Sequence, residues 1–186
     1  MKYGIVETVR YRVGQFLQAL TARVPDEEVE RATRVLTAEA RGLFRRQAMQ
    51  DQHHALAVYR ALYHAGHTDP RLLAAALLHD VGKAAARLSP WQRAMIVLLE
   101  RFAPRLLARL SQGEQRGYTW SVPEGWRRPF TVYARHPEVG ARWAQQAGCS
   151  PLTVALILRH QHRLPRCPAA EEDQLLAALQ AADSSN

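Results

Sequence analysis

Residues 70–83 read PRLLAAALLHDVGK, and this stretch decides the fold. The apolar run from Leu72 to Leu78 would make a helix here apolar on nearly every side. Such a helix belongs at the centre of a helical bundle. His79 and Asp80 stand at its end, in an environment where charge is costly unless it is paired or bound to a metal. The stretch therefore predicts an all-α fold with a buried His-Asp pair.

The rest of the chain also has helical patterning, and no run alternates as a strand would. Several helix starts are marked by a capping residue or a histidine followed by proline. Proline suits the first helical turn because its missing N–H would be unpaired there. These pairs are Asp69-Pro70, Ser89-Pro90, His136-Pro137 and Ser150-Pro151.

Two amphipathic helices are expected upstream, at 9–23 and 26–46, and a further helix at 50–65 ending at Gly66. Residues 112–129 hold three glycines and two prolines and read as a long loop. A last helix is expected at 171–182.

Composition limits the classes of protein that remain. The chain has 186 residues, 47% of them apolar and 23% charged, which is ordinary for a globular protein and excludes disorder. Cys149 and Cys167 form no CxxC pair, which argues against a disulfide scaffold or a cysteine zinc site. The longest apolar run has seven residues, whereas a membrane span needs about 20. We therefore expect a cytoplasmic protein with no membrane partner.

The net charge is +8, and residues 84–145 carry ten basic and four acidic side chains. A basic stretch can attract phosphate-bearing partners. A solvated, arginine-rich helical face explains the same excess. Nucleic-acid binding would rest on charge alone, because no helix-turn-helix pattern is clear, so we do not expect it.

Other candidate metal ligands lie on separate expected helices. His54 falls in mid-helix, His136 before a proline, His160 late in a helix and Asp183 near the C-terminus. Imidazole and carboxylate are ligands that divalent metals prefer. Spacing along the chain cannot by itself unite residues on different helices.

Three strings, QHHALAVYRAL, AALLHDVGK and ALQAAD, resemble the signature of the HD-domain metal-dependent phosphohydrolases. That signature is a histidine, an adjacent His-Asp and a distal aspartate. The resemblance covers about residues 48–183. It implies an all-α HD-type bundle over 48–186 with a metal site at its centre, and an N-terminal helical segment, 1–47, packed on that core.

Two more strings, ARHPEVGA and RHQH, resemble histidine segments of the two-metal members of this family. Gln161 stands where those members have a second histidine, and RLPRCPAA stands where the GYP segment should follow, so hydrolysis of cyclic di-GMP is not supported. The resemblance implies two divalent metals, with Asp80 bridging them and Fe, Mn, Mg, Ni, Co and Zn left open. The implied ligands are His54, His79, Asp80, His136, His160 and Asp183.

The implied activity is hydrolysis of a small phosphorylated substrate, with a nucleotide as the first candidate, by metal-activated hydroxide. Asp80 and Lys83 carry the catalytic roles, and Lys83 would hold a phosphate oxygen. The alternative is a non-catalytic HD module, regulatory or scaffolding, that binds a nucleotide or a protein partner. The oligomeric state stays open.

Some assignments have competitors. His53 competes with His54 as the first ligand, and a surface position is expected for His53. His162 could replace the missing second histidine, although a solvated loop position is the simpler interpretation. His136 and His160 could also be core or capping histidines in a one-metal protein.

Overall fold

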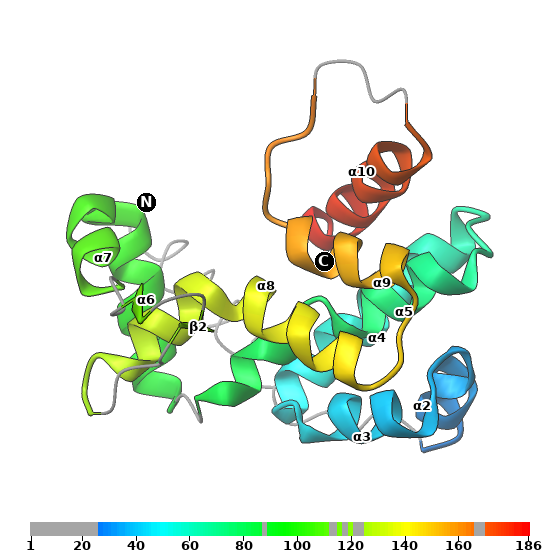
Figure 1. The fold of residues 1–186 in the computed structure, drawn as a ribbon, viewed down its shortest axis with the longest axis horizontal. Helices are drawn as coiled ribbons and strands as arrows, with labels where there is room; N and C mark the ends of the chain where they lie inside the picture. Colours follow the sequence, from blue (N-terminus) through cyan, green and yellow to red (C-terminus); the bar gives the residue numbers. More distant parts are fainter. Residues whose placement is uncertain (1–25, 87–88, 112–114, 117–118, 121–124, 166–169) are drawn as a thin grey trace, which may run out of the picture.

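A computed structural model describes residues 26–86, 89–111, 115–116, 119–120, 125–165 and 170–186. Over these residues the chain is helical apart from one short antiparallel pair, β1 (Gln115–Arg116) with β2 (Thr119–Trp120), as Figure 1 shows. The predicted all-α class is therefore confirmed for the described residues. The helix expected at 9–23 lies outside them.

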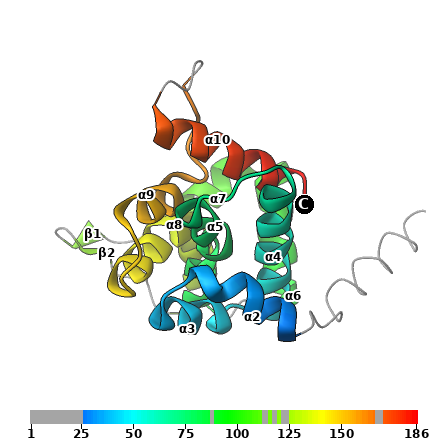
Figure 2. The ribbon, with the colours of Figure 1, turned by 90° about the vertical axis from the view of Figure 1, so that its right-hand side faces the viewer.

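The helix α5 (Pro70–Leu78) lies in the middle of the bundle, as expected. All seven residues from Leu72 to Leu78 are buried. Asp69 caps its first turn by accepting a 2.8 Å hydrogen bond from the backbone N–H of Arg71. Figure 2 shows α5 with helices on several sides. Its contacts are α4 (Met49–His64), α9 (Pro151–Arg159), α10 (Glu171–Ser184), α3 (Ala38–Arg46) and the 3₁₀ turn η1 (Thr33–Val35).

Most predicted helix boundaries are confirmed. Ser89 opens α6 (Pro90–Phe102) with a complete capping box to Gln92. Ser150 opens α9 and accepts a 3.1 Å hydrogen bond from the N–H of Thr153. Gly66 and Gly148 adopt φ values of 87° and 75° just after helix ends, in the left-handed region that favours glycine.

The predicted helix start at Pro137 is wrong. Pro137 lies inside α8 (Arg128–Gln146), which has Pro129 in its first turn instead. An interior proline leaves the carbonyl four residues earlier without its helical N–H donor. Here that carbonyl belongs to Tyr133, and Nδ1 of His136 donates to it at 2.6 Å. The histidine side chain thus replaces the missing backbone donor. The expected 112–129 loop contains β1 and β2 and ends where α8 begins.

The single helix expected at 26–46 is also wrong. The structure has α2 (Asp26–Ala32), then η1, then an extended Leu36, and only then α3. The break follows from Thr37, whose side chain accepts from the N–H of Ala40 at 3.1 Å and starts a new helix.

The described part of the N-terminal segment shares the main hydrophobic core. Ala40 and Phe44 are fully buried in the same cluster as the leucines of α5. A smaller cluster of Ile96, Leu107 and Phe130 joins α6 and α7 (Pro104–Leu110) to α8. Within the ranges described, no helix combines the length and the apolar content that crossing a bilayer requires.

Candidate metal centre

The rings of three buried histidines are held by the same kind of hydrogen bond. In His79, His136 and His160, Nδ1 lies 2.9, 2.6 and 2.7 Å from the carbonyl oxygen three residues earlier. These carbonyls have no helical N–H donor, because α5 and α9 end at the histidine and α8 contains Pro137. A carbonyl can only accept, so Nδ1 carries the proton and donates. This bond orients each ring and leaves Nε2 as the nitrogen that could bind a metal.

Asp80 connects two groups of possible ligands. His79 Nε2 lies 3.5 Å from Asp80 Oδ2, whereas His136 Nε2 and His160 Nε2 lie 3.2 and 3.9 Å from Asp80 Oδ1. The ligand atoms of His54, His79 and Asp80 all lie within 4.8 Å of one another, and so do those of Asp80, His136 and His160. The two carboxylate oxygens therefore face two different sets of imidazoles.

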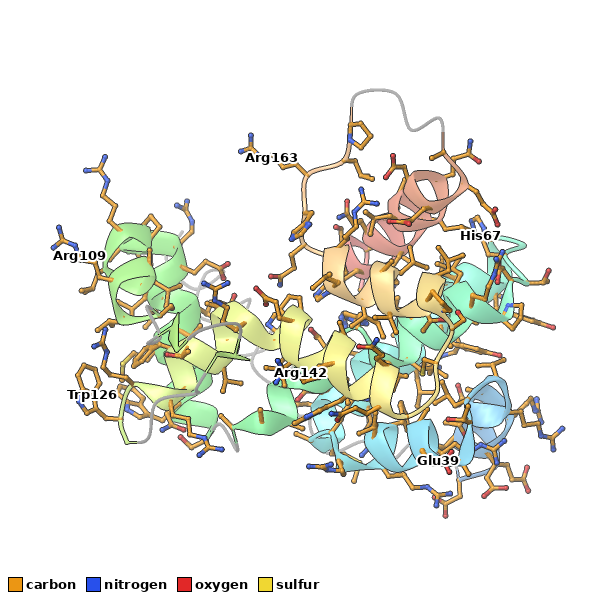
Figure 3. The ribbon with its side chains drawn as sticks, viewed as in Figure 1. Glu39, His67, Arg109, Trp126, Arg142 and Arg163 are labelled. Carbon is orange, nitrogen blue, oxygen red and sulfur yellow. The ribbon has the colours of Figure 1, made fainter. Side chains whose placement is uncertain are left out.

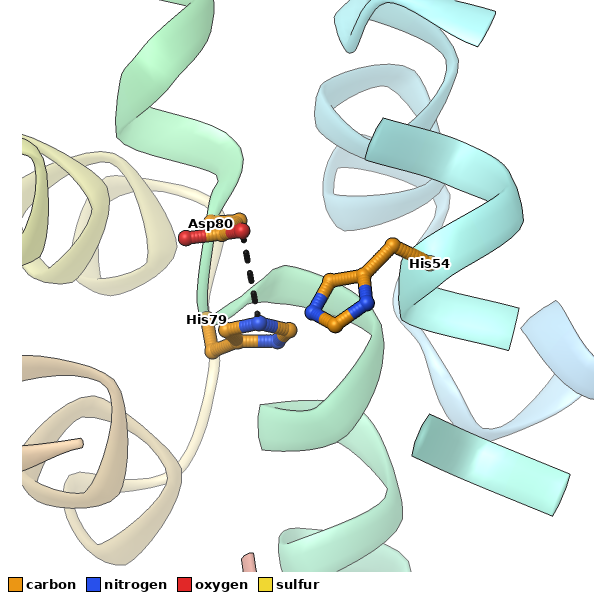
Figure 4. A group of neighbouring side chains, drawn as sticks. All are labelled: His54, His79 and Asp80. Carbon is orange, nitrogen blue, oxygen red and sulfur yellow. Dashed lines mark ion pairs between the residues drawn. The ribbon is translucent and has the colours of Figure 1, made fainter. Parts of the chain in front are cut away.

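The first group receives its residues from three helices. Figure 4 shows His54 on α4 facing His79 and Asp80 at the end of α5. Asp183 reaches the same point from α10, with Oδ1 2.8 Å from His54 Nε2 and 3.5 Å from His79 Nε2. The side chains of His54 and Asp183 are 29% and 32% exposed, whereas those of His79 and Asp80 are 1% and 5% exposed. The site is therefore buried at Asp80 and reaches solvent beside His54.

The charges of the centre favour a cation. Burial opposes protonation of His79, but the carboxylates of Asp80 and Asp183 outweigh it and raise its pKa to about 10. Burial also opposes ionisation of Asp80, yet His79 and Lys83 hold the pKa of that carboxyl well below its usual range. The pKa of Asp183 is lowered against its burial by the hydrogen bond with His54 and by the attraction of His79.

The pKa of His160 is shifted in the opposite direction from that of His79. Burial, followed by repulsion from His79, lowers its pKa to about 4. A neutral imidazole that keeps its proton on Nδ1 has its lone pair on Nε2, which is what a metal ligand needs. The Nε2 atom of His160 lies 3.3 Å from that of His136.

The residues fit a divalent metal. The Nε2 atom of His79 is buried and makes no hydrogen bond, although it points at two carboxylates. A buried nitrogen without a partner is costly in a folded protein. Imidazole nitrogens and carboxylate oxygens form a donor set that suits Zn, Fe, Mn, Co or Ni better than a soft thiolate-binding metal. A cation among these atoms would satisfy both the free nitrogen and the buried negative charge.

A close backbone approach holds the two ligand groups together. After Asp80 the chain continues as the 3₁₀ turn η2 (Val81–Ala85), which packs against α8. A Cβ at Gly82 would lie 2.0 Å from the carbonyl oxygen of His136 and 2.8 Å from the N–H nitrogen of Gly140. Gly82 does not have a positive φ. The close contact with α8, and not an unusual backbone conformation, therefore requires glycine here.

The two competing histidines, His53 and His162, are placed as follows. His53 is half-buried, so it lies only partly at the surface, and its Nε2 is covered and makes no hydrogen bond to a described residue. His162 is exposed, in keeping with a solvated position. Gln161 places Nε2 3.4 Å from His136 Nε2, so an amide borders the second group.

The structure also shows supporting residues that the sequence analysis missed. Gln180 on α10 donates to the backbone carbonyls of His160 and His162, both at 2.8 Å, and so fixes the end of α9. Gln47 donates at 3.0 Å to the carbonyl of Leu77, close to the end of α5. A glutamine in a helical sequence carries no pattern that distinguishes such a role. Arg159 pairs with Glu172 and Asp173 rather than with the centre.

Comparisons of the chain with protein-family models, with curated proteins and with solved structures found no match.

Proposed function

We propose that the chain is an HD-type metal-dependent phosphohydrolase with a two-metal centre. The observation that carries the proposal is the position of Asp80 between two histidine groups, each with its ligand atoms within 4.8 Å. A carboxylate shared in this way is the arrangement expected for a bridging ligand. The His…His-Asp…Asp order along the chain, with His136 and His160 added, supports the same assignment.

A pair of divalent metals in such a centre supplies an acidified water as nucleophile and an electrophile for the phosphoryl oxygens. The protein's own residues orient the imidazoles and exclude bulk water. The Nδ1 bonds fix three imidazoles, and burial of His79 and Asp80 keeps bulk solvent from the inner part of the site. The half-exposed side at His54 and Asp183 is the entrance that we assign to the substrate.

Lys83 is the cation best placed to meet a phosphate. Its Nζ lies 2.5 Å from Asp80 Oδ2, and its side chain is 22% exposed. A flexible ammonium that touches both the bridging carboxylate and solvent can hold a phosphate oxygen as a point charge.

Hydrolysis is tested by a screen of the purified, metal-supplemented chain against nucleoside mono-, di- and triphosphates, cyclic dinucleotides and simple phosphomonoesters. Release of phosphate or of a nucleoside monophosphate that chelation abolishes is the expected result. Bound metal without turnover on any member of the screen would contradict the enzyme and favour a regulatory or scaffold module.

Replacing Lys83 by Ala is expected to leave the metal content unchanged and to lower kcat/KM roughly ten- to a thousandfold, the effect of losing one charged contact to the transition state. Steady-state kinetics on the best substrate from the screen, with metal analysis of the same sample, measures both quantities. A wild-type kcat/KM in this variant would show that Lys83 pairs with Asp80 but has no catalytic role.

The second metal depends on the second histidine group. We expect His136→Asn and His160→Asn each to reduce the metal content from two ions per chain to one. His162→Asn is the matched control, because His162 is exposed and lies just after α9, close to His160 in the chain. This variant is expected to keep both ions. Elemental analysis gives the count. One ion in the fully loaded wild type, unchanged by either substitution, would reduce the centre to the group around His54 and His79.

A further inference from the structure

A cavity of about 800 Å³ lies beside the metal centre and has no part in the function proposed above. The residues around it come from the end of α3, from η2 and the residue after it, from α6 and from α8. None of the six proposed metal ligands lines it. Its volume falls within the range of small-molecule sites, about 300–1,000 Å³.

Positive charge is concentrated in this cavity. Among the described residues, four arginines and one carboxylate, Glu138, line it. Most of the charged residues form one stripe of α8, because their spacing of three, four and seven residues places them on one helix face. Figure 3 marks Arg142, the last residue of this stripe, on α8. The four arginines are Arg46, Arg128, Arg135 and Arg142.

Neighbouring groups hold several of these side chains. Arg128 donates to the carbonyl of Ala85 at 2.9 Å, and Arg135 pairs with Glu138 Oε1 at 2.9 Å. The guanidinium of Arg46 stacks 5.0 Å from the centre of the Trp143 ring. In the described part of the chain, no carboxylate lies within ion-pair distance of Arg46 or Arg142. Net positive charge in a concave surface focuses an attractive potential on anions.

The other walls indicate a ligand with an organic part. Ala84, Val139 and Trp143 give the cavity an apolar side. Guanidinium groups match phosphate oxygens in a bidentate geometry. Phosphates and an apolar ring on one small molecule are features of a nucleotide.

We propose that this cavity is a nucleotide-binding site, separate from the metal centre, in which Arg46 and Arg142 bind the phosphates. The cavity volume of about 800 Å³ favours a small ligand over a nucleic-acid strand. The apolar wall covers the ring.

The test is titration calorimetry of the full-length, metal-loaded chain with the non-hydrolysable ATP analogue adenosine 5′-(β,γ-imido)triphosphate. The double variant Arg46→Gln/Arg142→Gln is expected to bind the analogue at least tenfold more weakly, since two charge-assisted contacts are lost. The matched control is Arg109→Gln/Arg163→Gln, which has the same net charge. Both of its arginines are exposed, neither lines the cavity, and both lie away from Arg142 in Figure 3. The affinity of this control is expected to equal that of the wild type.

Three results would overturn the proposal. Equal affinity in the wild type and the cavity variant would place the nucleotide at the metal centre alone. Equal weakening in both double variants would indicate general attraction to a basic surface. Absence of analogue binding, with tight binding of a short RNA instead, would assign the arginines to nucleic acid. None of these readouts depends on turnover, so they are independent of the hydrolase activity.

Discussion

Replacing Asp80 by Asn is expected to remove both metals and all metal-dependent hydrolysis. Asp80 contributes one oxygen to each ligand group, at 3.5 Å from His79 Nε2 and 3.2 Å from His136 Nε2. The amide has nearly the same shape but lacks the negative charge that two cations need. Substitution of outer-shell partners of a metal costs about 10–100-fold in affinity, so loss of a bridging ligand should exceed about 100-fold. Elemental analysis after gel filtration and a phosphatase assay measure the two effects.

The matched control is Asp69→Asn at the other end of the same helix. Asp69 caps α5, and asparagine is an equally good capping residue, so fold, metal content and activity should persist. Full metal content and turnover in Asp80→Asn would show that the bridging assignment is wrong.

Replacing Gly82 by Ala is expected to lower the free energy of unfolding by about 3 kcal/mol or more, at the upper end of the range for overpacking. The new Cβ would lie 2.0 Å from the backbone oxygen of His136, and a backbone atom cannot move aside as a flexible side chain can. To relieve the clash, η2 must move away from α8, and Asp80 would then separate from His136. Urea denaturation measures the free energy of unfolding. Metal analysis of the folded fraction measures the loss of metal that separating Asp80 from His136 would cause.

Gly42→Ala is the control for this substitution. Gly42 lies exposed in α3, and a Cβ there meets nothing within 4 Å. Alanine is preferred over glycine inside a helix, so this variant should gain roughly 0.5–1 kcal/mol. If Gly82→Ala were as stable as the wild type, the close contact between η2 and α8 would not exist in solution.

The central helix could be predicted from the sequence because local signals agreed there. The apolar run from Leu72 to Leu78 required burial, and Asp69-Pro70 marked the start. The break between α2 and α3 was missed because Thr37 resembles any polar residue on an amphipathic helix until its side chain is seen to accept from Ala40.

Pro137 shows how a correct local rule fails in context. His-Pro has the form of a helix start, and proline inside a helix normally leaves a carbonyl unpaired. His136 supplies the missing donor to Tyr133, so the helix continues. The same bond orients the histidine toward Asp80, and the irregularity of the helix therefore serves the centre.

The candidate ligands could be named from the sequence, but their proximity could not. His54, His79 and Asp183 lie on or at the ends of three helices, and only their packing brings the three side chains together. The arginine-lined cavity could not be predicted from the sequence, for the same reason. Arg46 comes from α3 and Arg142 from α8, and in the sequence they were part of a general basic excess.

The central claim is that the buried histidines and Asp80 hold divalent metal. X-ray data collected at the manganese absorption edge, on crystals of the full-length chain grown with Mn²⁺, test it most directly. We predict two anomalous peaks that share Asp80, one bound to His79 Nε2 and one to His136 Nε2, at normal metal–ligand distances of about 2.0–2.4 Å. Crystals with no anomalous peak near either nitrogen would contradict the account.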